Sequence, residues 1–291
     1  MPVYTKLFLV FFLLVYFSYY AVIHIFRKNE HLAYKLSNIL LLISSMAFYA
    51  YSGVRFLIVL LLFGAVAYIS GIVLSRVSTK FRKLFTFLFI FIEILPICLY
   101  RIIGLYLNIA GKNGPVSVLG LSFFSLQIVT YTYGVYANRI DAEKSILSVM
   151  LFACFFPCVS SGPIQRAEKL LPQIRKRRVF DYDSSADGLK LLAFGYFKKL
   201  VLADNLAVYI QSVRNDYAQA YALAVLLSVI LYSFQLYLDF SGYSDIVTGC
   251  AKTFGFDLGK NFDHPYLSRS VSEFWGRWHI SLSSWLRDFV Y

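Results

Sequence analysis

The chain has 291 residues, of which 59% are hydrophobic and only 15% charged, and its mean hydropathy is +0.64. A soluble globular domain could not bury this much apolar surface, so the composition excludes that class. The net charge of +12 does not indicate nucleic-acid binding, because the basic residues lie between apolar runs rather than along one polar face. We therefore predict a polytopic integral membrane protein whose basic residues set its topology and contact anionic lipids.

Six apolar stretches approach or exceed the length that crosses a bilayer core of about 30 Å as a helix. The first stretch begins within ten residues of the N-terminus, and further apolar runs follow it, so we interpret it as a retained span rather than a cleaved signal. The predicted spans are residues 7–25, 36–51, 56–74, 84–100, 116–136 and 221–240.

Basic links between the spans predict the orientation. Arg27, Lys28 and Lys35 follow the first span, and a second basic cluster at 76–83 follows the third. Cytoplasmic loops carry an excess of Lys and Arg, so both clusters are placed in the cytoplasm, and the N-terminus is then outside. The expected location is the plasma (inner) membrane of the cell, crossed several times.

Residues 146–160 break this alternation of spans. If they crossed the bilayer fully, the densest basic run, at 166–178, would lie outside. Pro157 and Pro163 break helices, and non-helical backbone at membrane depth is tolerated only where protein or a wet cavity covers it. We therefore predict a re-entrant segment that lines a site. The stretch 187–210, whose lysines alternate with apolar residues, is predicted to lie on the cytoplasmic surface as an amphipathic helix.

Polar residues interrupt the apolar pattern after residue 239, and chemistry is expected there. The oxygen-rich stretch 237–245 lacks the ligand spacing of a calcium loop. Instead, Gly242 is predicted to break the helix, and Asp239 and Asp245 to hydrogen-bond the backbone groups freed there. The four cysteines lie in or beside apolar segments, so neither a disulfide nor a metal site is expected.

The segment 272–288 contains His279 and all three tryptophans of the chain. An interfacial amphipathic helix with an aromatic belt explains this composition. The alternative is a site helix, because an imidazole can act as a base or a hydrogen-bond donor near neutral pH, and a polar group at membrane depth is costly unless it is used. Composition alone leaves both interpretations open.

Three blocks of the sequence resemble the membrane-bound O-acyltransferase (MBOAT) family, in its bacterial branch of alginate O-acetyltransferases and teichoic acid D-alanyl transferases. The blocks are 156–166, 237–245 and 261–291, and the last is long and ordered enough to be specific. Weaker similarities at 120–124 and 198–204 favour the alginate-type branch. The resemblance implies an all-α integral membrane fold, a polytopic ring of tilted transmembrane helices with re-entrant segments and a central tunnel.

No internal repeat or linker is visible, so residues 1–291 are predicted to form a single membrane domain. Within it, 1–145 would hold the N-terminal helices, 146–220 the re-entrant segment and cytoplasmic amphipathic helices, and 221–291 the start of the catalytic core. His279 matches the first of two motif histidines of the family. The second, implied to be essential, stands in a Trp-His-Gly segment that this chain does not contain, so the chain is expected to be truncated before it and not fully active.

The resemblance implies an enzyme that moves an acetyl or other short acyl group from a cytoplasmic thioester, such as acetyl-CoA, to hydroxyls of an extracytoplasmic polysaccharide or to a partner acetyltransferase. D-alanyl transfer to teichoic acid, a transporter, and a catalytically incomplete scaffold that recruits partners through its basic surface are the alternatives. No bound cofactor is expected, because the thioester is a substrate. His279 would orient or polarise the reacting groups. The expected substrate-lining or tunnel-lining residues are Pro163, Arg166, Asp239, Ser241, Tyr243, Asp245, Asn261, Trp275, Arg277, Trp278 and Ser281.

Overall fold

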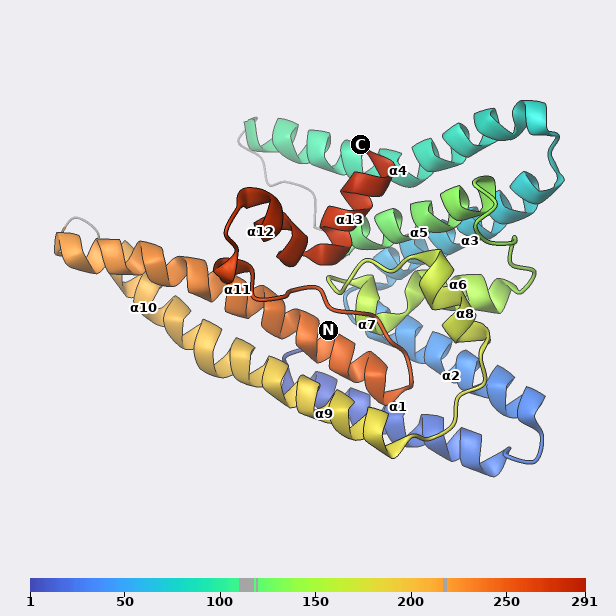
Figure 1. The fold of residues 1–291 in the computed structure, drawn as a ribbon, viewed down its shortest axis with the longest axis horizontal. Helices are drawn as coiled ribbons and strands as arrows, with labels where there is room; N and C mark the ends of the chain where they lie inside the picture. Colours follow the sequence, from blue (N-terminus) through green and yellow to red (C-terminus); the bar gives the residue numbers. More distant parts are fainter. Residues whose placement is uncertain (110–117, 119, 217–218) are drawn as a thin grey trace. The chain divides into compact units, whose positions relative to one another are not determined.

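The computed structural model describes residues 1–109, 118, 120–216 and 219–291, which form helices and no strand (Figure 1). The predicted all-α membrane class is confirmed, because several helices are long and apolar enough to cross a bilayer. These are α1 (Lys6–Ile25), α2 (Glu30–Ala50), α3 (Val54–Arg76), α4 (Thr79–Ile109) and α11 (Ala222–Thr253).

The predicted fifth span corresponds to α5 (Leu121–Tyr136), which has 16 residues and is shorter than these five helices. Residues 116, 117 and 119, at the predicted start of that span, lie outside the described residues.

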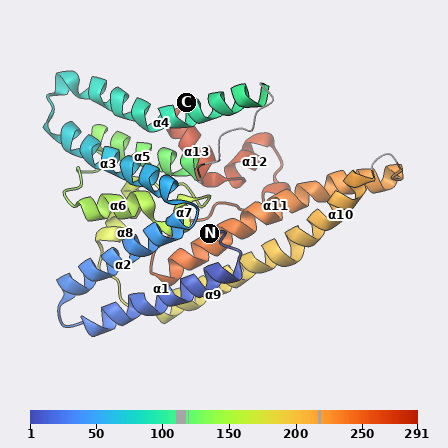
Figure 2. The ribbon, with the colours of Figure 1, turned by 180° about the vertical axis from the view of Figure 1, so that it is seen from behind.

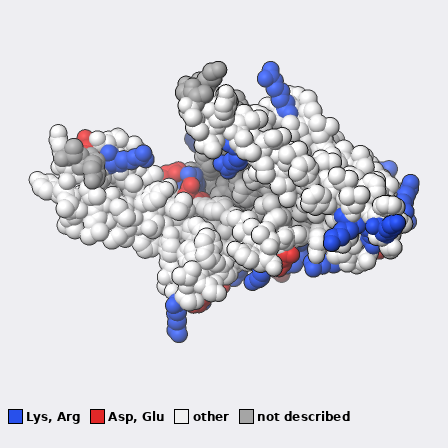
Figure 3. Space-filling model, turned by 90° about the horizontal axis from the view of Figure 1, so that it is seen from above, with Lys and Arg blue, Asp and Glu red and all other residues white. Residues whose placement is uncertain are grey.

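Exposed apolar side chains mark the faces that need lipid. In the most apolar windows of α4 and α11, only 6% and 0% of the residues are buried by protein. On the face drawn in Figure 3, most of the surface is neither acidic nor basic. Apolar surface of this extent is not stable in water, so these helices require a bilayer around them.

Contacts divide the described chain into two compact units. Unit 1 comprises Met1 and Leu14–Val179, and unit 2 comprises Pro2–Leu13 and Phe180–Tyr291. The single membrane domain, the ring of helices and the tunnel stay predictions.

Unit 1 is built around α6 (Ile146–Cys154), which contacts α2, α3, α5 and α8 (Ala167–Arg175). The helical conformation is interrupted at Phe155, which separates α6 from the short helix α7 (Phe156–Val159). Every residue from 151 to 160 is buried. Protein therefore covers the non-helical backbone, as a segment at membrane depth requires. The re-entrant course through the bilayer stays a prediction.

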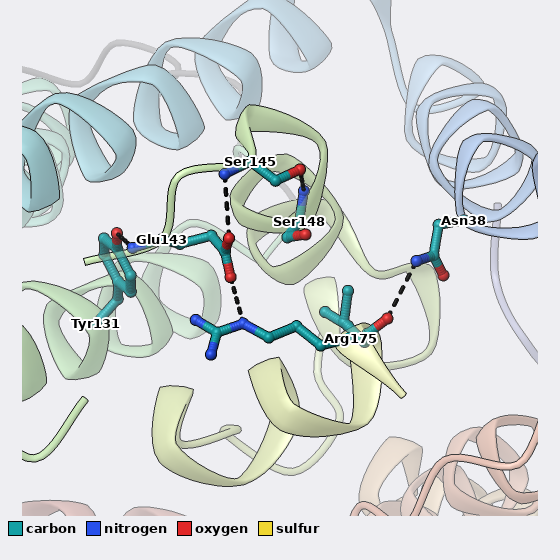
Figure 4. A network of polar contacts seen from close by, with 7 residues as sticks. Asn38, Tyr131, Glu143, Ser145, Ser148 and Arg175 are labelled. Carbon is teal, nitrogen blue, oxygen red and sulfur yellow. Dashed lines mark hydrogen bonds and ion pairs between the residues drawn. The ribbon is translucent and has the colours of Figure 1, made fainter. Parts of the chain in front are cut away.

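A polar network in unit 1 fixes α8 to the rest of the unit (Figure 4). Arg175 Nε donates to Glu143 Oε2 over 2.5 Å, and the Glu143 backbone N–H donates to Tyr131 OH over 3.0 Å. Asn38 Nδ2 donates to the carbonyl of Ile174 over 3.1 Å, which ties α2 to the same helix. These bonds hold the end of α8 between α2 and the segment after α5.

Two further arginines of the basic run bind within unit 1. Arg177 pairs with Glu30, and Arg178 donates to Tyr19 OH over 2.6 Å and to Asn38 Oδ1 over 2.5 Å. These arginines therefore hold helices of unit 1 together.

Unit 2 contains α9 (Tyr182–Tyr196), the π-helix η1 (Phe197–Ala203), α10 (Asp204–Asn215), α11, the 3₁₀ turn η2 (Pro265–Leu267), α12 (Val271–Arg277) and α13 (Ile280–Phe289). The helices α9 and α11 lie side by side in both ribbon views (Figures 1 and 2).

Glycine pairs allow α9 and α11 to approach each other at backbone distance. A Cβ placed on Gly249 would lie 2.6 Å from the carbonyl oxygen of Gly188, and one on Gly242 would lie 2.9 Å from that of Gly195. Only a residue without a side chain fits at such a contact. The two pairs are seven residues apart on each helix (195 − 188 and 249 − 242), so they lie on one face, two turns apart.

Substituting Gly249 by alanine is expected to destabilise the protein by about 1 to 3 kcal/mol, because the added Cβ meets backbone atoms that cannot rotate away. The midpoint of thermal unfolding of the full-length protein in detergent measures this loss. Gly276→Ala is the matched control, since a Cβ there has no neighbour within 4 Å. Equal midpoints for the two variants would contradict the backbone contact.

Candidate functional site

His279 stands between α12 and α13 in unit 2. It is the N-cap residue of α13, and its φ of 45° is in the left-handed region. The side chain is buried, with 6% of its surface exposed. Non-glycine residues adopt this conformation only where the surroundings hold it, and such positions concentrate at functional sites.

Asn261 holds the His279 imidazole. Asn261 Oδ1 lies 3.2 Å from His279 Nδ1, and it also accepts from the backbone N–H of Ser281 over 3.2 Å and from Ser281 Oγ over 2.9 Å. A backbone N–H can only donate, so the Asn261 atom that faces it must be the amide oxygen. An amide oxygen accepts from an Nδ1–H, so this geometry favours the tautomer with the proton on Nδ1 and the lone pair on Nε2.

Aromatic rings surround the imidazole. The Phe240 ring meets it edge-on with centroids 4.9 Å apart, and the Phe262 ring lies 6.3 Å away. Trp278 packs edge-on against Phe262 at 5.2 Å and stacks with Phe274 at 5.6 Å. Burial in this apolar setting lowers the pKa of His279 from 6.5 to about 4, so the imidazole is neutral at physiological pH.

Acid is expected to destabilise the protein through His279. Because the folded-state pKa lies below the unfolded value, the unfolded chain binds the proton more tightly, and stability falls as the pH drops below 6.5 until it levels near 4. The loss between pH 7.5 and pH 5 is about 2 kcal/mol. Thermal unfolding in detergent across this range measures it. His279→Gln should reduce the pH dependence by that amount, and an unchanged dependence would contradict the assignment.

A cluster of charges joins η1 to α11 and to the start of α10, and its two lysines are largely buried. Lys198 Nζ pairs with Asp245 and donates to Ser241 Oγ over 3.4 Å. Lys199 Nζ lies 2.5 Å from Asp239 Oδ1 and 2.8 Å from Asp204 Oδ1. The π-helical turn places two consecutive lysines toward carboxylates, and π-helical turns occur frequently at functional sites.

The charge cluster bears on two predictions. The stretch 187–210 runs through α9, η1 and α10, with Lys198 only 8% exposed, and its position at the cytoplasmic surface stays a prediction. Asp239 and Asp245 bind lysines rather than freed backbone, and α11 continues through Gly242 to Thr253. The predicted helix break at Gly242 is therefore wrong.

A cavity of about 1040 Å³ lies within unit 2, between α9 with η1, the C-terminal half of α11 and the loop 255–264. Its charged lining includes Lys198 and Asp245, and its aromatic lining includes Phe262. Asn261 also lines the cavity, so the residue that holds His279 forms part of the cavity wall. The cavity has the size and mixed lining of a small-molecule site.

The other predicted site residues fall in two groups. Arg277 pairs with Glu273 over 2.7 Å, Trp275 is 54% exposed, and Tyr243 lies half-buried on α11. Pro163 and Arg166 belong to unit 1, where the Pro163 carbonyl accepts from Gln165 Nε2 over 3.0 Å. Within unit 2 the structure brings together His279, Asn261, Ser281 and Trp278 in one group, and Asp239, Ser241 and Asp245 in the other.

Sequence analysis missed Lys198, Lys199 and Phe240 as site residues. The signal for the lysines was present, because two adjacent cations stand in an otherwise apolar segment, and buried cations need carboxylate partners. The apolar helix that carries Asp239 and Asp245 could supply them.

The fold and the site define an integral membrane protein with a buried, neutral imidazole beside a charged cavity. Over residues 121–291 the sequence matches the family model described as MBOAT, membrane-bound O-acyltransferase family. The chain belongs to this family, in the branch of the alginate O-acetylases.

Curated relatives agree with this membership. A probable alginate O-acetylase of Pseudomonas fluorescens is 32% identical over 87% of this chain and 51% of the relative. A peptidoglycan O-acetyltransferase of Helicobacter pylori is 28% identical over 99% of this chain and 60% of the relative. A teichoic acid D-alanyltransferase of Bacillus subtilis is 27% identical over 60% of this chain and 45% of the relative. The chain thus spans about half the length of these relatives.

Proposed function

We propose that the whole protein is a membrane-bound O-acyltransferase that moves an acetyl or other short acyl group from a thioester to hydroxyls of a polysaccharide. The buried group of His279, Asn261 and Ser281 carries the proposal, because it lies inside the segment that matches the family. The names of the Pseudomonas and Helicobacter relatives, an alginate O-acetylase and a peptidoglycan O-acetyltransferase, support a polysaccharide acceptor.

The reaction joins the acceptor hydroxyl to the acyl carbonyl carbon. The new C–O bond forms as the C–S bond of the thioester breaks, and the hydroxyl proton passes to a base and then to the departing thiolate. A neutral His279 with its lone pair on Nε2 is suited to orient or polarise the hydroxyl. The family resemblance assigns the principal base to a second histidine.

The proposed topology puts donor and acceptor on opposite sides of the plasma membrane. The thioester, acetyl-CoA in the simplest case, would enter from the cytoplasm, where the basic links after α1 and α3 are placed, and the N-terminus would be outside. The acceptor is then an extracytoplasmic polysaccharide, or a partner acetyltransferase that passes the group on.

Everted membrane vesicles from the host test this proposal. Acetyl-CoA labelled in its acetyl group is supplied to the exposed cytoplasmic face, and base-labile label in polysaccharide is counted. Label should enter polymer in vesicles with the gene and not in vesicles from a deletion strain. Equal labelling in the two preparations would overturn the proposal.

The similarity to a teichoic acid D-alanyltransferase gives a second candidate, D-alanyl transfer. The same vesicles distinguish it. If the protein transfers D-alanyl groups, a labelled D-alanyl thioester supplied in place of acetyl-CoA should produce the base-labile label in the polymer. Labelled acetyl-CoA should then produce none.

A further inference from the structure

Both the main chain and the side chain of Asn261 make hydrogen bonds that hold it beside His279. Its carbonyl oxygen accepts from the backbone N–H of Ile280 over 2.9 Å, and the N–H of Asp263 donates to the carbonyl of Arg277 over 2.9 Å. The loop segment 261–263 is thus hydrogen-bonded to the residues that lead into α13. The Asn261 amide oxygen is thereby fixed against the ring of His279.

Packing does not explain an amide at this position. Asn261 is 3% exposed, and its Nδ2 has no hydrogen-bond partner among the described residues. A buried donor without a partner destabilises a protein, whereas a leucine of similar size would carry no such penalty. The side-chain oxygen, which binds His279 and Ser281, is therefore the part of Asn261 that the site uses.

A carboxylate would supply the same oxygen with different chemistry. An aspartate on Nδ1–H would stabilise the imidazolium, whereas an amide fixes the ring and leaves it neutral. The rings of Phe240 and Phe262 on the imidazole also favour the uncharged form. Residue 261 thus sets both the tautomer and the charge of the histidine.

We infer that Asn261 is a positioning residue for acyl transfer: its side-chain oxygen holds His279 as the Nδ1–H tautomer and directs the basic Nε2 nitrogen to the reacting groups. The inference deepens the proposed function and rests on it for the role in catalysis. The tautomer itself is measurable without turnover, so the two can fail separately.

Nitrogen NMR of the full-length protein in lipid nanodiscs, labelled with ¹⁵N in histidine, tests the tautomer. The ring signals of His279 are those that disappear in His279→Gln. The wild type and Asn261→Asp, which keeps the oxygen, should show a protonated Nδ1. Asn261→Leu should show a mixture with protonated Nε2, and the exposed Asn205→Leu should match the wild type. A wild type protonated at Nε2 overturns the inference even if Asn261→Leu does not fold.

Acyl-transfer kinetics test the role. Asn261→Leu should lower kcat by about 10-fold to 100-fold, because misplacement of a reacting group has effects of this size, and the KM for the thioester should stay within about twofold. Asn261→Asp should recover part of that loss. An active wild type whose kcat is unchanged by Asn261→Leu, despite the altered tautomer, overturns the positioning role. An inactive wild type with the Nδ1–H tautomer instead counts against the proposed function.

Discussion

Replacement of His279 by alanine is expected to lower acyl transfer by the full-length protein by about 100-fold or more, the usual contribution of a positioned proton-transfer or polarising group. The imidazole is buried, neutral and fixed by Asn261, so a water molecule cannot replace it in the variant. The loss should appear in kcat rather than in the KM for the thioester, because the side chain acts on the reacting groups and not on donor binding.

The measurement is the acetyl content of surface polysaccharide after the substitution is introduced into the chromosomal gene. His31→Ala is the matched control, since His31 is exposed in α2 of unit 1. If deletion of the gene abolishes acetylation but His279→Ala preserves it, the site assignment is wrong although the function stands.

Substitution of Lys198 by methionine is expected to cost about 3 kcal/mol of stability, because it leaves Asp245 charged and unpaired inside unit 2. The side chains of Lys198 and Asp245 are only 10% and 26% exposed, so water compensates little of the loss. Chemical unfolding of the full-length protein in detergent measures the difference.

Two further variants complete this test. Lys198→Met combined with Asp245→Leu should recover most of the stability, since an apolar pair replaces the ion pair without a buried charge. Lys190→Met is the control, because its pair with Asp187 is 78% and 54% exposed and contributes less than about 1 kcal/mol. If the Lys198 and Lys190 variants lose equal stability, the buried pair is not a structural element.

The membrane helices could be predicted because a long apolar run has few alternatives to a helix in a bilayer. The predicted ends of the spans were wrong where polar residues interrupt a helix that continues. The predicted span 221–240 stops where Asp239 and Ser241 begin, whereas α11 continues to Thr253. Lys199 pairs with Asp239 and Lys198 donates to Ser241, and both lysines stand some 40 positions earlier in the chain. A partner so distant in sequence is not visible in local hydropathy.

The sequence motif named His279 as the candidate site residue, and Asn261 and Ser281 were expected to line the substrate site or tunnel. Their contacts with the imidazole were not predicted. Neither the left-handed backbone of His279 nor the direction of the Asn261 amide could be read from the sequence, because both depend on the bonds between the loop 261–263 and the start of α13. The sequence shows that an imidazole and an amide are present, whereas the tertiary hydrogen bonds of the loop 261–263 determine that the Asn261 oxygen faces His279 Nδ1.

The glycine contacts between α9 and α11 restrict how this helix pair can slide. Gly188 and Gly195 of α9 meet Gly249 and Gly242 of α11, and side chains such as Ile246 occupy the positions between. The next register that pairs glycine with glycine is seven residues away, a translation of about 10.5 Å along the axis. Smaller steps would drive side chains into backbone, so the glycine contacts hold the two helices in a single register.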